Sequence, residues 1–131
     1  MDNYFLKVKE YLLDLNVEID HEDSEESVFV VSHEDDGIKN MVLGIAEPII
    51  ILEQFIFELK QPSVDVYKSL LQKNRDMISG AFVLDESGTK VLFRDTLAIE
   101  NLDLNELEGS FNALSLVLSE YSNEIIRFSK N

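Results

Sequence analysis

Cysteine is absent from this 131-residue sequence, which excludes disulfides, thiol nucleophiles and cysteine-based zinc or iron–sulfur sites. Long apolar runs are absent too, since runs such as residues 49–52 are far too short to span a bilayer. The first residues lack the basic segment and the uninterrupted apolar stretch of a signal peptide. We therefore expect a cytoplasmic protein that is not inserted into a membrane.

Basic residues are scarce, with 11 Lys and Arg against 26 Asp and Glu, a formal net charge of −15. A field of this sign repels phosphate backbones and anionic lipid, so we expect no nucleic acid and no membrane surface as partner. Between residues 18 and 36 there are nine acids and no Lys or Arg. That segment is either a solvated edge or a docking site for a basic partner.

Histidine occurs only twice, and both His21 and His33 open the tripeptide His-Glu-Asp. The apolar run 28–31 between them has none of the residues that favour a turn. We therefore predict one extended strand over 24–33, with the two histidines at its solvent-exposed ends. The two imidazoles would then lie at least about 20 Å apart. One metal ion cannot then be bound by both, and only a weak surface cation site at 33–36 stays open.

Apolar periodicity predicts the remaining elements. Helices are expected at 2–15, capped by Asp2 or Asn3, at 63–77, and as one long helix at 104–128. Strands are expected near 27–32, 39–47, 49–59, 81–85 and 91–96, with Pro48 marking a bend, bulge or edge. The long helix has a 3-4 apolar repeat, which indicates a core stripe, with a coiled coil as the alternative.

The order α-β-β-β-α-β-β-α, with short turns between consecutive strands, requires antiparallel pairing. We therefore predict an α+β fold, with a five-stranded antiparallel sheet and three helices in one domain over residues 1–131. The loop at 85–88 lacks the spacing of a calcium loop, and the sequence has no phosphate loop or nucleophile elbow. We expect no catalysis, no cofactor and no resident metal.

The strand at 49–59 is largely apolar on both of its faces. Three helices cover only one face of a five-stranded sheet economically, so part of the second face should meet another chain. The alternative is that the helix at 63–77 covers this face internally. The candidate partner-binding residues come from the second and third strands and from this helix: Ile45, Ile50, Leu52, Ile56, Val64, Tyr67 and Leu71.

One block of sequence carries a family resemblance: Leu-Leu-Gln-Lys-Asn at 70–74, Gly-Ala-Phe-Val-Leu-Asp-Glu-Ser-Gly at 80–88, and Val-Leu-Phe-Arg at 91–94. With the order of elements and the acidic charge, it resembles the class I type III secretion chaperone fold, and more closely its YbjN-like branch of sensory transduction regulators. The resemblance implies a small bacterial homodimer without catalytic residues. The secretion chaperones bind an extended segment of an effector along apolar surface.

The sequence therefore favours a non-catalytic, homodimeric protein-binding module, chaperone-like or regulatory, that captures an extended apolar segment of a client protein. The alternative is an enzyme or small-molecule-binding domain with an acidic cleft around Glu53 and Glu58, for which a buried Glu53 would be the indicator.

Overall fold

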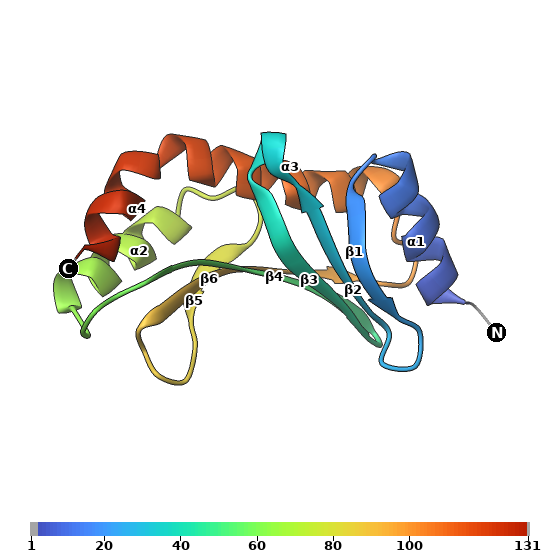
Figure 1. Ribbon diagram of the computed structural model, residues 1–131, viewed down its shortest axis with the longest axis horizontal. Coiled ribbons are helices and arrows are strands. Elements are labelled where there is room, and N and C mark those ends of the chain that lie inside the picture. The colour runs from blue at the N-terminus through green and yellow to red at the C-terminus, as the bar shows by residue number, and fades with distance from the viewer. Residues whose placement is uncertain (1–2, 131) are drawn as a thin grey trace.

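The computed structural model describes residues 3–130, which form six strands and four α-helices around one antiparallel sheet (Figure 1). The helices are α1 (Tyr4–Asp14), α2 (Val64–Asn74), α3 (Leu104–Glu120) and α4 (Ser122–Ser129), with a short 3-10 helix η1 (Glu34–Asp36). The strands are β1 (Glu18–Asp23), β2 (Val28–His33), β3 (Ile38–Ala46), β4 (Ile49–Glu58), β5 (Ala81–Leu84) and β6 (Lys90–Ala98). The α+β class is confirmed, whereas the predicted five strands and three helices are wrong by one each.

The strands lie in the order β1-β2-β3-β4-β6-β5, so β1 and β5 are the two edges. All the helices lie on one side of the sheet: α1 near β1, α3 across the middle, and α2 and α4 beside the β5 end (Figure 1). The opposite, helix-free face is therefore open. Helix α2 does not cover it, and the apolar surplus of β4 on that side stays uncovered.

The first correction is the hairpin β1–β2, which replaces the single strand expected at 24–33. Residue His21 lies opposite Val30, and the chain turns at 24–27. The Asp23 carboxylate accepts hydrogen bonds from the N–H groups of Glu25 (3.0 Å) and Glu26 (3.1 Å), an Asx-type turn. The polar residues before the apolar run make the turn, not the run itself.

In this register His21 lies opposite Val30. His33 lies three residues further along β2, which places it roughly 10 Å from Val30. The predicted separation of more than 20 Å is therefore wrong. His33 Nδ1 lies 3.0 Å from a carboxylate oxygen of Asp36. Over residues 3–130, no group of three or more His, Asp or Glu side chains is placed to hold a metal ion.

The second correction is a break in the last helix at Tyr121, which has φ −108° and ψ 15°. The apolar repeat continues across this break, and Phe111, Leu114 and Phe128 are all buried. The bend lets α4 turn down against β4, where the Phe128 ring lies 6.2 Å from that of Phe57. The stripe is thus a core stripe rather than a coiled coil.

Local sequence explains the other element boundaries. The Asn3 side chain caps α1 by accepting from the Leu6 N–H at 3.1 Å, while the other predicted cap, Asp2, lies outside the described residues. Pro48 follows a cis peptide bond in the two-residue turn between β3 and β4, with Ala46 opposite Ile49, so the predicted bend is confirmed.

Two apolar clusters fill the space between the helices and the sheet. The first joins α1 and α3 to β2, β3, β4 and β6, and includes Phe29, Leu52 and Phe93. The second joins α2 and α4 to the far end of the sheet, and includes Phe57 and Phe82. Within residues 3–130, every helix is too short or too polar to cross a bilayer.

Candidate binding surfaces

The structure separates the seven predicted contact residues into two groups. Ile50 and Leu52 are 0% exposed and belong to the first cluster, so neither can contact a partner in this structure. Alternation along β4 points both toward α3, a direction that strand periodicity alone cannot give. Ile45 and Ile56 are partly buried and pack against the core.

The helix residues of the prediction lie together at the β5 edge. Val64 is 79% and Leu71 is 71% exposed, while Tyr67 is half-buried and donates its hydroxyl hydrogen to the carbonyl of Gly88. A groove of about 350 Å³ runs between α2 and β5, with almost entirely apolar walls. We call this surface the α2–β5 face, defined by Val64, Tyr67, Leu71, Val83 and Leu84.

The sequence prediction missed two apolar side chains at this end of the molecule. Leu84 is 42% exposed on β5, and Ile78 is 87% exposed in the loop that joins α2 to β5. In the sequence, Leu84 ends the apolar run 81–84 and Ile78 follows Met77, and nothing in either pattern indicates which side chain is exposed. Single exposed apolar residues are common, so only their position beside α2 makes them notable.

Asn74 fixes α2 against the sheet edge. Its side-chain amide donates to the carbonyl of Phe82 at 3.1 Å and accepts from the N–H of the same residue at 2.7 Å. The backbone groups of Phe82 that face away from β6 are therefore already paired, which obstructs strand addition at the middle of β5. A partner on the α2–β5 face would therefore have to bind mainly through side chains.

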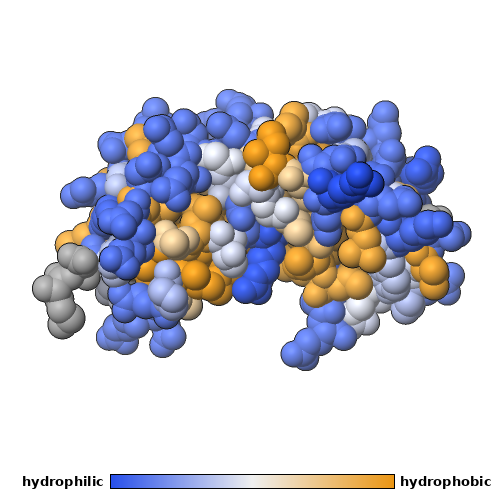
Figure 2. All heavy atoms as spheres, turned by 180° about the vertical axis from the view of Figure 1, so that it is seen from behind, coloured by the Kyte–Doolittle hydropathy of each residue, from blue (hydrophilic) through white to orange (hydrophobic). Residues whose placement is uncertain are grey.

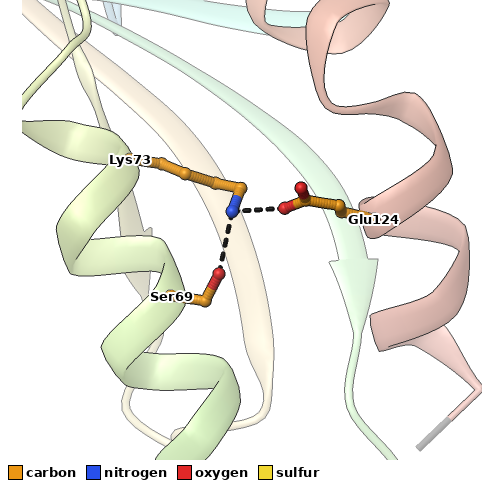
Figure 3. Close-up of polar contacts among 3 residues, drawn as sticks. All are labelled: Ser69, Lys73 and Glu124. Atoms are coloured by element: carbon orange, nitrogen blue, oxygen red, sulfur yellow. Dashed lines mark hydrogen bonds and ion pairs between the residues drawn. The ribbon is translucent and has the colours of Figure 1, made fainter.

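Lys73 connects α2 to α4. Its ammonium group donates to Ser69 Oγ at 2.8 Å and forms an ion pair with Glu124 (Figure 3). It also lies 5.0 Å from the ring centroid of Tyr121, and its side chain is only 14% exposed. Burial, together with nearby carboxylates, raises the pKa of the Tyr121 phenol. This cluster holds the buried side of α2 in place, so the opposite side is presented to solvent.

The acidic residues of the alternative hypothesis lie on the surface. Glu53 forms an ion pair with Arg94 at 2.9 Å on the helix-free face, and its side chain is 35% exposed. Glu58 is exposed at the end of β4. The buried Glu53 that would indicate an acidic cleft is therefore not found.

The two edges of the sheet differ in character. On β1, Glu18, Asp20 and Glu22 are exposed, and Glu22 pairs with Lys9 at 3.0 Å. Charged side chains on an edge strand discourage pairing between copies of the chain.

Seen from behind, hydrophobic areas lie on both halves of the molecule, separated by a hydrophilic strip above a hollow at the lower edge (Figure 2).

Solved structures share this fold. YbjN from E. coli is 12% identical, with a TM-score of 0.69 and 92% of each chain covered. The Yersinia pestis type III secretion chaperone SycH, solved with a fragment of YscM2, is 19% identical, with a TM-score of 0.58, covering 97% of this chain and 100% of that one. A chain of the ExsC–ExsE complex is 18% identical, with a TM-score of 0.68, covering 94% and 96%.

At these identities the likeness establishes the fold alone. No curated protein sequence matches this chain. The family model CesT_Tir_1, of the type III secretion chaperone family, matches residues 1–131. The expected resemblance is confirmed, and the chain belongs to this chaperone family.

Proposed function

We propose that this chain is a non-catalytic, homodimeric cytoplasmic protein, chaperone-like or regulatory, that holds an extended apolar segment of a client protein. Family membership supports a binding role over catalysis. SycH was solved with a fragment of YscM2, and ExsC with ExsE, so members of this fold do form complexes with other chains. The observation that most supports the homodimer is the exposed apolar surface of the α2–β5 face.

The second copy occupies the α2–β5 face. Val64 and Leu71 are each more than 70% exposed beside an apolar groove, a pattern typical of a surface that another chain covers. The strongly acidic strand β1 lies at the other end of the sheet. Pairing through the β5 end therefore keeps the two acidic edges apart. A stable dimer requires about 1,500 Å² of buried surface in total.

The client lies on the helix-free face of the sheet, which the dimer leaves open. Val42 is 42% and Phe55 is 53% exposed on this side. An apolar segment that bound there would cover the side of the sheet on which residues 3–130 place no helix (Figure 1).

Light scattering tests the dimer. The wild-type chain should be a dimer at micromolar concentration, and Leu71→Glu should be a monomer with unchanged circular dichroism, because the substitution places a charge in the apolar contact. Leu13→Glu is the matched control, since Leu13 is 57% exposed on α1 and should not affect dimerisation. A wild type that stays monomeric at high micromolar concentration, or a dimeric Leu71→Glu, would contradict this interface.

A further inference from the structure

The local sequence does not require the bend between α3 and α4. The apolar repeat continues through Tyr121, and residues 110–130 include neither proline nor glycine, two common causes of a kink. Helical hydrogen bonds lie on both sides of the bend. The Tyr121 N–H donates to the Val117 carbonyl at 3.0 Å, and the Ile125 N–H donates to the Tyr121 carbonyl at 2.9 Å. The sequence is therefore compatible with one straight helix over 104–129.

Two serine hydroxyls contribute to the bend. Ser119 Oγ donates to the carbonyl of Leu116 at 3.1 Å, and Ser122 Oγ donates to the carbonyl of Ser119 at 3.5 Å. Serine side chains that bond back to a preceding carbonyl bend a helix and destabilise it slightly. This effect is small, so the bend depends on the contacts that hold α4 against the rest of the molecule.

Lys73 of α2 reaches three side chains of the bend and of α4. Its ammonium group pairs with Glu124 (Figure 3), and it lies 5.0 Å from the ring centroid of Tyr121 and 5.7 Å from that of Phe128. An ammonium group that is largely removed from water is attracted to aromatic faces more strongly than an exposed one. These three residues extend from the start of α4 to its last turn, so a single charge acts along the whole helix.

Phe128 covers part of the second apolar cluster. It is 6% exposed, and its ring lies beside that of Phe57 on β4. Leu59 and Val66 in the same cluster are each 2% exposed. In a straight helix Phe128 would lie roughly 10 Å beyond Tyr121 along the axis of α3, away from this position. Straightening would therefore uncover apolar side chains that α4 now covers.

We propose that α3 and α4 form a two-state element whose bent state is selected by the charge of Lys73. In the bent state α4 covers the second cluster. In the straight state residues 104–129 form one helix, and Phe57 and Val66 become accessible from the side that α4 leaves. Loss of the Lys73 charge shifts the population toward the straight state, because that charge contacts α4 only in the bent one. This switch goes beyond the proposed function, since it requires neither a second copy nor a client.

Cysteine labelling measures how often α4 leaves its position, because the chain has no cysteine of its own. Val66→Cys places a thiol on the side of α2 that also carries Ser69 and Lys73, since residues three and four apart share one side of a helix. Val31→Cys is the matched reporter, because Val31 is 0% exposed in the first cluster. Each thiol reacts with an aromatic disulfide reagent only while its site is open, so the labelling rate reports the open fraction.

Charge removal is tested at two lysines of the same helix. Lys73→Gln should speed labelling at position 66 at least about tenfold, because an ion pair and two cation–π contacts are lost. It should change labelling at position 31 by less than about twofold, because the rest of the fold stays closed. Lys68→Gln is the control, since Lys68 is exposed on α2 and should change neither rate by more than about twofold.

A second variant leaves Lys73 intact. Ser122 and Asn123 are exposed at the bend, and Ser122→Ala with Asn123→Ala raises the helix propensity there. Labelling at position 66 should become at least about twofold faster in this double variant. Combined with Lys73→Gln, the two alanines should make the straight state the major one.

Backbone NMR of the combined variant distinguishes a straight helix from an unravelled one. In the straight state the Cα shift of Tyr121 moves to helical values, the amides of 122–124 gain protection from exchange, and 125–129 stay helical. That result, with faster labelling at position 66 in Lys73→Gln, supports the switch. An unchanged rate at position 66, equal acceleration at positions 31 and 66, or a combined variant in which Tyr121 stays non-helical or 122–129 unravel would overturn it.

Discussion

Two amide side chains form backbone hydrogen bonds that a neighbouring strand would otherwise form. Asn74 pairs both backbone groups of Phe82 at the β5 edge, and Gln54 pairs with Gly37 and Lys39 where β3 and β4 separate. Each amide carries one acceptor and two donors, so each can imitate a peptide group. In the sequence, neither residue differs from an ordinary polar residue near an element boundary.

At position 80, both the backbone conformation and the available space require glycine. Gly80 has φ 76°, and a Cβ there would overlap the ring of Phe93 and lie 3.1 Å from the carbonyl oxygen of Arg94. We expect Gly80→Ala to destabilise the fold by at least about 2 kcal/mol, through backbone strain and overpacking. Urea denaturation measures this change.

Gly109 provides the matched control for that substitution. It lies inside α3, and a Cβ there would have no neighbour within 4 Å. Gly109→Ala should therefore stabilise the protein by about 0.5–1 kcal/mol, because alanine favours helix. Equal effects of the two substitutions would contradict this reading of Gly80.

At the scale of elements, the sequence predicted the helices and strands correctly wherever apolar periodicity and core packing agree. The stripe of α1, the strands on both sides of Pro48, and the β5–β6 hairpin all follow from such patterns. It failed at β1, whose composition of Glu, Asp and His has little strand propensity. That strand forms because β2 offers an edge to pair with, which is a tertiary cause.

The continuous last helix was wrong, and two of the seven predicted contact residues, Ile50 and Leu52, are buried, for a related reason. The 3-4 apolar repeat continues through Tyr121, so one non-helical residue leaves no trace in the pattern. Similarly, alternation divided β4 into two faces but did not say which face the helices cover. For that reason Ile50 and Leu52 were predicted as contacts, although the core buries them.

The junction of α2 and α4 depends on a partly buried ion pair. We expect Glu124→Gln to destabilise the protein by about 1–2 kcal/mol, because the Lys73 ammonium, only 14% exposed at its side chain, loses its charged partner. Hydrogen exchange should become faster in α4. Denaturation curves and amide exchange measure the two effects.

The Lys9–Glu22 pair is the control for this substitution. Both of its side chains are more than a third exposed, so Glu22→Gln should change the stability by less than about 0.5 kcal/mol. If the two substitutions have equal effects, the α2–α4 pair is only a surface contact.

At the scale of the whole molecule, the two edges of the sheet differ in the side chains that lie beside them. The edge strand β1 and the neighbouring η1 carry acids, whereas the opposite edge carries the α2–β5 face. In the proposed dimer, the second copy covers the α2–β5 face and the acidic β1 edge stays in contact with solvent.

The net charge makes stability depend on salt. A formal charge of −15 on 131 residues includes like charges that the ion pairs described above do not neutralise, so self-repulsion destabilises the compact state. Added sodium chloride shortens the Debye length from about 30 Å at 0.01 M to about 8 Å at 0.15 M, so we expect Tm to rise over this range.

The variant Asp20→Asn, Glu34→Gln, Asp35→Asn removes three acids from the densest segment and should show a smaller rise in Tm. Both series are melted at one protein concentration, because association of copies would make Tm depend on that concentration. A wild-type Tm that is unchanged or lower in salt would show that the repulsion is negligible.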